Sequence, residues 1–226
     1  MEPGPSAVLT MLLADSRFPA GTYAHSLGLE QAVADGLGAD GVPAFAAARL
    51  RLVGDPDARL AVAARRAAAR RDPGALARLD AEHDARCPSP VLREHARRLG
   101  AQLLRSAATV WPGLAIDAYR AASASTPRPV ALGVVAAAAG LDDGRLAALS
   151  LYDDVATVTS AALKLLPLDP TLAARWVADL APDIAVAAGA IAADPRPIDE
   201  QPAPSALALE RAATDHHRTR ERLFVS

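Results

Sequence analysis

Cysteine and aromatic residues are scarce in this 226-residue chain, and each shortage excludes a class of protein. The single cysteine, Cys87, excludes an internal disulfide framework and every metal site built from several thiolates. Aromatic residues make up only 4% of the chain, whereas hydrophobic residues make up 51%. The core must therefore be built from Ala, Leu and Val, and alanine has the highest intrinsic helix propensity. This composition predicts an all-α protein.

The chain also lacks an excess of charge of either sign. A formal charge of −2 and a pI near 6.2 provide no attraction toward nucleic acid or an anionic membrane. The N-terminus has no basic region before its short apolar run, so it does not resemble a signal peptide. No uncharged apolar stretch reaches the ~20 residues that are needed to cross a bilayer. We expect a cytoplasmic protein with no nucleic-acid or membrane partner.

The spacing of apolar residues predicts a compact multi-helix bundle of about eight to ten helices. The clearest stripe is Leu92, Ala96, Leu99 and Leu103, on a helix that begins after Pro88 and is supported by a Glu94–Arg98 ion pair. Helices are also predicted over 7–15, 43–54, 57–71, 151–165 and 169–194. The second is expected to stop at Gly54, the third at the Asp72-Pro73-Gly74 break, and the last to be interrupted near Pro182.

The run "DPRPIDEQPAP", residues 194–204, contains four prolines and no helical period, which is typical of a linker. It divides the chain into a helical domain over 1–193, the linker itself, and a C-terminal helix with a docking tail over 205–226. We expect the N- and C-terminal segments to be mobile. Residues 215–226 in particular are predicted to be poorly ordered in the free protein, because the linker isolates them.

Catalytic and metal-binding motifs are not evident. The glycines of the N-terminal region match neither a phosphate-binding loop nor a dinucleotide-binding turn, and no HExxH is present. The adjacent His216 and His217 point about 100° apart on a helix, so they are only weak metal candidates. Cys87 would need His83 as a base, and an incidental cysteine is the simpler interpretation. The arginines of 65–71 are interpreted as a solvated helix face.

Two features remain that enzyme chemistry does not explain. "FPAGTYAHSLGLEQAV", residues 18–33, concentrates turn residues, a Tyr, a His and a Glu, with Ser26 as a candidate helix N-cap and Gly28 as a sign of close approach. At the other end the chain finishes in "RLFVS", where Leu223 and Phe224 need a surface to cover them. We therefore interpret the C-terminal segment as one that folds when it binds a partner.

These two segments resemble the ends of the urease accessory protein F (UreF) family. "LLADSRFPAGTYAHSLGLEQAV" is similar to its N-terminal signature and "HHRTRERLFVS" to its closing motif. Between them, "LREHARRLGAQLLR", "PRPVALGVVAAAAGL" and "SAALKLLPLDP" resemble three further family segments in family order. The resemblance covers nearly the whole chain, from about residue 9 to residue 226.

The resemblance implies an all-α protein, usually dimeric, without catalytic activity. It implies a bridge between the D- or H-type accessory protein and the nickel-binding GTPase G during nickel delivery to apo-urease. No cofactor would be bound tightly, since nickel would be handled in the complex and GTP bound by the partner. The partner-binding residues it suggests are Tyr23, His25, Ser26, Glu30, Lys164, Arg222, Leu223, Phe224 and Ser226.

Two alternatives stay open at this point. The first is an independent metal-binding protein or hydrolase that uses His25, His83 or His216, for which a stoichiometric bound ion would be the sign. The second is a helical adaptor unrelated to urease. Within the preferred interpretation, the run 130–166 is the candidate for core and dimer support. Lys164, the only lysine in the chain, is expected on an exposed loop edge.

Overall fold

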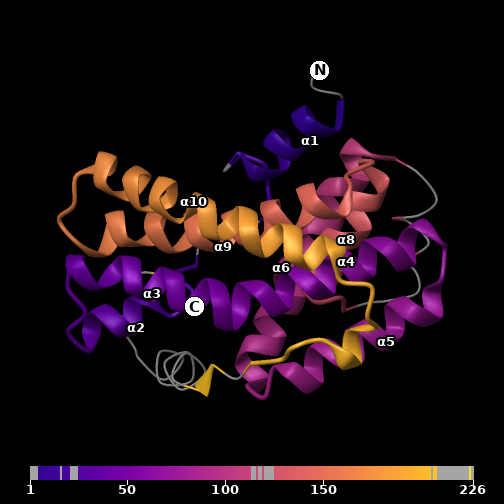
Figure 1. Cartoon of the computed structure of the whole chain (residues 1–226), viewed down its shortest axis with the longest axis horizontal. Helices are drawn as coiled ribbons and strands as arrows, with labels where there is room; N and C mark the ends of the chain where they lie inside the picture. The colour runs from indigo at the N-terminus through magenta and orange to yellow at the C-terminus, as the bar shows by residue number, and fades with distance from the viewer. Residues whose placement is uncertain are drawn as a thin grey trace.

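The computed structural model describes residues 5–15, 17–20, 25–112, 116, 119, 125–204, 206–207 and 224. Within these ranges the regular structure is helical and contains no strand, which confirms the predicted all-α class. The α-helices are α1 (Pro5–Ala14), α2 (Leu29–Ala34), α3 (Val42–Arg49), α4 (Asp55–Ala69), α5 (Pro73–Arg86), α6 (Pro90–Val110), α8 (Arg128–Ala138), α9 (Asp143–Leu165) and α10 (Pro170–Ala193). They pack as a single bundle (Figure 1).

Helices α3 and α4 are joined without a break, so the predicted stop at Gly54 is wrong. The link is a π-helical turn, η3 (Leu50–Gly54). Gly54 keeps right-handed helical dihedrals, with φ −60° and ψ −45°, and Pro56 lies in the first turn of α4. A π-turn offsets the side chains on either side of it. Here it lies between Arg49 and Asp57, two residues that line the cavity described below.

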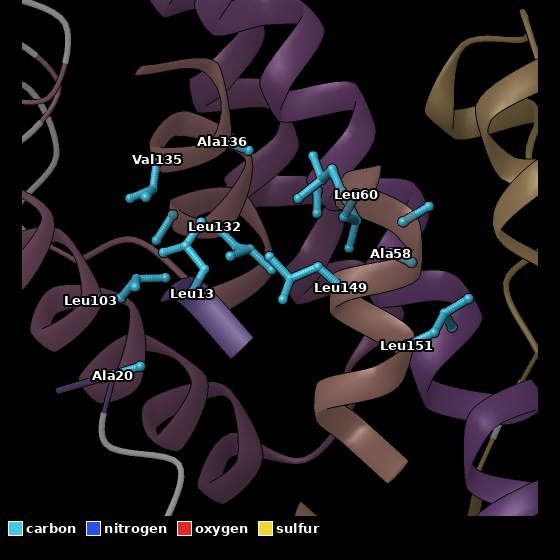
Figure 2. Close-up of a cluster of buried hydrophobic side chains, with 14 of the residues drawn as sticks. Leu13, Ala20, Ala58, Leu60, Leu103, Leu132, Val135, Ala136, Leu149 and Leu151 are labelled. Carbon is cyan, nitrogen blue, oxygen red and sulfur yellow. The ribbon is translucent and has the colours of Figure 1, made fainter. Parts of the chain in front are cut away.

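Helix α8 is the centre of the bundle. Every residue from Pro129 to Ala136 is buried, and the helix packs against α4 and α6. Close approach to α4 depends on Gly133, where a Cβ would lie 2.3 Å from the Ala61 carbonyl oxygen and 2.6 Å from the Ala64 Cβ. Figure 2 shows Leu132 and Val135 of α8 among leucines of α4, α6 and α9. The α8 part of the run 130–166 is therefore core, as predicted, and the α9 part buries one face on it. Its predicted support of a dimer stays a prediction.

Helices α9 and α10 lie antiparallel along one side of the bundle (Figure 1). The predicted interruption at Pro182 is wrong, because α10 continues through it with the proline on the exposed side. Within the described residues, α10 is long and apolar enough to cross a membrane by length and composition alone. Trp176, Leu180 and Ile184 bury its inner face on the bundle, whereas Arg175 and Asp179 form an ion pair at 3.6 Å on its outer face. The outer face thus carries this ion pair together with exposed apolar residues, among them Val186, which is 75% exposed.

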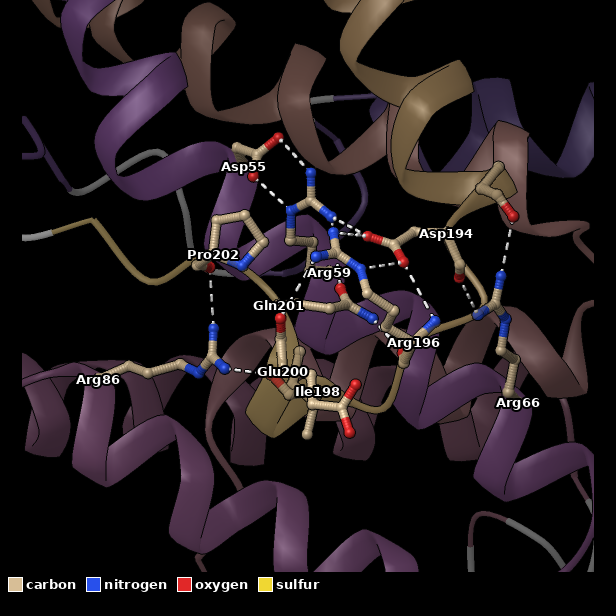
Figure 3. Close-up of polar contacts among 11 residues, drawn as sticks. Asp55, Arg59, Arg66, Arg86, Asp194, Arg196, Ile198, Glu200, Gln201 and Pro202 are labelled. Carbon is tan, nitrogen blue, oxygen red and sulfur yellow. Dashed lines mark hydrogen bonds and ion pairs between the residues drawn. The ribbon is translucent and has the colours of Figure 1, made fainter.

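The Pro-rich segment 194–204 is bound to the helical bundle over its length rather than hanging free of it. It runs back along α4 and α5 and is held there by three arginines (Figure 3). The Arg59 guanidinium donates to Asp194 Oδ2 at 3.0 Å and to Gln201 Oε1 at 3.4 Å. Arg86 donates to the carbonyl oxygens of Ile198 and Pro202. We call residues 194–204 the strap, since these bonds join chain segments more than a hundred residues apart.

Part of the arginine run 65–71 is structural rather than solvated. Arg65 and Arg66 both pair with Asp143 at the start of α9, the second at 2.8 Å. Arg66 also donates to the carbonyl oxygens of Ala192 and Asp194 at the end of α10. These guanidiniums bind helix ends, where backbone carbonyl oxygens lack helical partners. Arg70 and Arg71, beyond the last turn of α4, are exposed as predicted.

Candidate functional site

The N-terminal motif is anchored on α6. Phe18 is buried and its ring lies 6.2 Å from that of Trp111, between centroids, while the Ser106 hydroxyl donates to the Pro19 carbonyl oxygen at 2.9 Å. Ser26 does not cap a helix with its side chain, contrary to the prediction. The N-cap of α2 is Gly28, whose φ of 90° lies in the left-handed region that glycine adopts without strain. The Ser26 carbonyl oxygen accepts instead from the Leu29 N–H at 3.1 Å.

Behind this motif lies a partly open cavity of about 170 Å³, with a mostly apolar lining into which several charged and histidine side chains also face. Its walls come from α4, α5, α6, α8 and α9, and the end of the strap, at Ala203 and Pro204, closes one side. His25 lines this cavity and also a second hollow of about 390 Å³ between α1 and α9, which we call the α1 groove. His25 thus stands between two partly open hollows.

His25 meets His95 of α6 at the cavity wall. The two rings are edge-on, with centroids 4.0 Å apart, and the residues are only 7% and 6% exposed. Burial lowers the pKa of His25 to about 4, and the nearby Arg98 and Arg128 guanidiniums act in the same direction. Burial, followed by repulsion from His25 and the arginines, lowers the pKa of His95 to about 3. Both imidazoles are therefore neutral at pH 7.

Two arginine–carboxylate pairs line the same cavity, and sequence reasoning missed them. Arg49 of α3 pairs with Asp154 of α9 at 2.9 Å, and Arg128 of α8 pairs with Asp153. Within the described residues Arg128 Nε and Asp154 Oδ2 are buried without a hydrogen-bond partner. Burial raises the pKa of Asp57, which also faces the cavity. In the sequence, the adjacent Asp153 and Asp154 in the middle of the apolar repeat of 151–165 could have indicated these pairs.

Three of the predicted partner-binding residues meet at one place. The Phe224 N–H donates to Glu30 Oε2 at 3.1 Å, and Lys164 Nζ lies 5.0 Å from the centroid of the Phe224 ring. Phe224 is only 4% exposed and belongs to the main hydrophobic core. We call Glu30, Lys164 and Phe224 the C-terminal clasp. It brings the N-terminal motif, the end of α9 and the end of the chain together.

The clasp corrects two expectations. Phe224 does have a surface of its own chain to cover, so the prediction that it lacks one is wrong. Its ring belongs to the main hydrophobic core, and the Glu30 carboxylate and the Lys164 ammonium contact the same residue. Lys164 is exposed, as predicted, but it lies in the last turn of α9 rather than on a loop.

Other predicted residues lie outside the described part of the chain. These are Tyr23 in the N-terminal motif, Arg222, Leu223 and Ser226 in the tail, and the metal candidates His216 and His217. Their roles stay predictions. Among the residues that the structure describes, no three or more His, Cys, Asp or Glu side chains are grouped to hold a metal ion. His83 and Cys87 both line the cavity, and the Cys87 thiol approaches the Ser89 carbonyl oxygen at 3.8 Å.

Comparison with known proteins gives a consistent result. The sequence model of the family described as UreF matches residues 38–181. The chain is 36% identical over 222 residues to the urease accessory protein UreF of Mycobacterium sp. (strain JLS), an alignment that covers 96% of this chain and 97% of that protein. It is 39% identical over 165 residues to the protein of the same name from Mycobacterium marinum, covering 72% of this chain and 74% of the relative.

Proposed function

The chain belongs to the UreF family of urease accessory proteins, and we propose that within urease maturation it is a non-catalytic bridge between two other maturation factors. One is the D- or H-type accessory protein and the other is the nickel-delivering GTPase G, with apo-urease as the recipient. Nickel is then cargo of the assembled complex rather than a resident cofactor of this chain. GTP is bound by the partner.

The observation that carries this proposal is the match to urease accessory proteins over almost the full length of the chain. The position of the clasp supports it. Glu30, Lys164 and Phe224 come from three separate parts of the sequence, and the family resemblance suggests partner binding for each of them. Their meeting at one place makes the surface around them the candidate docking region. His25 and Ser26 lie in the same N-terminal motif but are buried, so they act there by holding the motif in shape.

The proposed assembly has direct consequences for purified proteins. The chain, the D-type accessory protein and the GTPase with GTP and Ni²⁺ should form one complex in size-exclusion chromatography with light scattering. Without this chain, the D-type protein and the GTPase should elute separately. Co-elution of those two proteins without the chain, or failure of the chain to bind either, would contradict the bridging role.

We further propose a cytoplasmic homodimer, as the family resemblance suggests. Light scattering of the isolated protein at high micromolar concentration should give twice the monomer mass of 23.3 kDa. A monomer throughout this concentration range would show that any dimer requires a partner.

A further inference from the structure

One carboxylate on the wall of the cavity has no partner. Three arginines line this cavity and each is paired, namely Arg49 with Asp154, Arg128 with Asp153 and Arg86 with Glu82. Asp57 lines the same cavity, but within the described part of the chain it forms no hydrogen bond and no ion pair. Three guanidiniums therefore face four carboxylates, which leaves an excess of one negative charge.

An ionised Asp57 destabilises the isolated chain. Most of the cavity lining is apolar, and a carboxylate without a partner is unfavourable in such surroundings. Burial accordingly raises the pKa of Asp57, an effect that His83, Arg49 and Arg128 oppose and that Asp154 strengthens. The helix does not require a negative charge here, because α4 continues from η3 without a free N-terminus. A residue that lowers stability without a structural reason is typical of a functional position.

The size of the cavity suits one side chain rather than a larger ligand. Its volume of about 170 Å³ lies below the roughly 300–1,000 Å³ of pockets that hold drug-sized molecules. The cavity is partly open and Asp57 is half-buried, so a group from outside can reach the carboxylate. Leu60 of α4 and Leu92 and Leu99 of α6 provide apolar surface beside it.

A guanidinium is the cation that fits these surroundings best. It is planar and weakly hydrated, it donates several N–H groups to a carboxylate, and its aliphatic stem can lie along an apolar wall. An ammonium is more strongly hydrated, so its transfer into a mostly apolar cavity is less favourable. A divalent metal ion is less suited, because no three or more His, Cys, Asp or Glu side chains are grouped to hold one among the described residues.

We propose that the cavity is a binding pocket for an arginine side chain of a maturation partner, with Asp57 as the carboxylate that pairs with it. The identity of the partner rests on the proposed function. The guanidinium enters from the open side, and its stem packs on the leucines of α4 and α6. The occupied pocket then contains four guanidiniums and four carboxylates, so its charge is balanced. Arginines that are buried in this way are among the residues that contribute most to protein interfaces.

Cys87 allows the pocket to be tested without a partner protein, because the only thiol of the chain lines the same cavity. The rate of its alkylation by iodoacetamide is followed on the full chain by intact-mass spectrometry, with millimolar ethylguanidinium chloride as the probe. We expect saturable protection of the thiol in the wild type. Ethylammonium should protect more weakly, and sodium chloride at the same concentration should not protect.

Asp57→Asn should weaken the affinity of ethylguanidinium about tenfold, because it removes the charge of the acceptor. The matched control is Asp183→Asn, which changes an exposed carboxylate on α10 and should behave like the wild type. The Tm of the isolated chain distinguishes binding from structure. Asp57→Asn should keep or raise the Tm, since it removes an unpaired charge, whereas a lower Tm would make Asp57 a structural residue.

Isothermal titration calorimetry with the D-type protein and with the GTPase then identifies the partner. Asp57→Asn should bind one of the two at least about tenfold more weakly than the wild type, because an arginine at the interface loses its carboxylate. Asp183→Asn should bind both partners like the wild type.

The two kinds of experiment separate the pocket from the function. Absence of protection by ethylguanidinium, or equal protection in the wild type and Asp57→Asn, would overturn the pocket even where the three proteins assemble. Protection by Ni²⁺ alone would make the cavity a metal site instead. Unchanged binding of both partners by Asp57→Asn would overturn the partner's arginine as the occupant. Protection that depends on Asp57, with neither partner bound by the wild type, would contradict the proposed function but support the guanidinium pocket.

Discussion

Distant parts of this chain meet in two very different ways, at the α4–α8 crossing and at the C-terminal clasp. The crossing is apolar and closed, and its two backbones approach so nearly that no Cβ fits at Gly133. The clasp includes a buried ring, a hydrogen bond of 3.1 Å and an ammonium 5.0 Å from the ring centroid. Close-packed interiors resist any change of volume, whereas a few surface contacts can be replaced by equivalent ones.

The difference predicts that the crossing contributes more to the stability of the bundle than the clasp does. The crossing joins the central helix α8 to α4, so a change there affects the whole bundle. The clasp attaches a chain end, so its loss should leave the bundle folded. The strap is intermediate, because it attaches residues 194–204 to α4 and α5 through buried guanidiniums.

The largest effect is expected from Gly133→Ala. The new methyl group would lie 2.3 Å from the Ala61 carbonyl oxygen, so α4 and α8 must separate. We expect a loss of about 3 kcal/mol in the free energy of unfolding, or roughly 6–12 °C in Tm. The matched control is Gly189→Ala in α10, where nothing lies within 4 Å of a Cβ. That change should raise stability by ~0.5–1 kcal/mol through helix propensity, and equal Tm values for the two variants would refute the tight crossing.

Arg59→Met should have the next largest effect. It removes the donor shared by Asp55, Asp194 and Gln201 and leaves these acceptors in a largely buried place. Calorimetry should show a Tm lower by about 5–10 °C. Arg175→Met is the control, because its ion pair on α10 is 3.6 Å long and exposed, and such pairs contribute little. If Arg59→Met and Arg175→Met have the same Tm, the bonds of Arg59 to the strap do not contribute to stability.

A smaller loss is expected from Phe224→Ala. The ring is buried against the main core, but it lies near a chain end where the surroundings can relax. We expect about 1–2 kcal/mol in the free energy of unfolding, with unchanged helical circular dichroism. From the sequence, Phe224 was expected to need the surface of a partner, which would have implied almost no loss of stability in the isolated chain. A loss as large as that of Gly133→Ala would make the tail part of the core rather than a clasp.

The His25–His95 pair should make the free energy of unfolding change gradually with pH. Its folded pKa values, about 4 and about 3, lie below the ordinary 6.5 of an unfolded chain. Below pH 6.5 the unfolded chain therefore binds more protons than the folded chain. The contribution of the two neutral imidazoles to the free energy of unfolding is complete above that pH and is lost as the pH falls toward 4. Denaturant titrations should show a slope of up to about 1.4 kcal/mol per pH unit for each imidazole. A His25→Gln/His95→Gln variant should have a flatter profile, and an identical slope would exclude the pair as its source.

Local patterns in the sequence predicted those parts of the fold that depend on neighbouring residues. The stripe of α6 and its Glu94–Arg98 ion pair, 3.2 Å long, are as predicted. So is the break at Asp72, whose side chain accepts from the Ala75 N–H at the start of α5. Each of these features follows from spacings of three or four residues. The all-α class and the family resemblance were likewise accessible from the sequence.

The features that could not be predicted depend on partners far away in the chain. Arg59 binds residues 135 and 142 positions away, and nothing near it in the sequence indicates this. The prolines of the strap remove helical hydrogen bonds but do not reveal what the strap lies against. In the same way the ending of the chain suggested a partner for Phe224, and its partner in the folded chain is Glu30, 194 positions away.

The most direct test of the account is the nickel content of urease made with and without this chain. Urease should be purified from cells that carry the urease subunits and the other accessory genes, grown with Ni²⁺, and analysed by inductively coupled plasma mass spectrometry. With the chain present, we predict active urease that contains nickel. Without it, the same urease should be assembled but inactive and nearly free of nickel. Equal nickel content and activity in the two preparations would contradict a role in urease maturation.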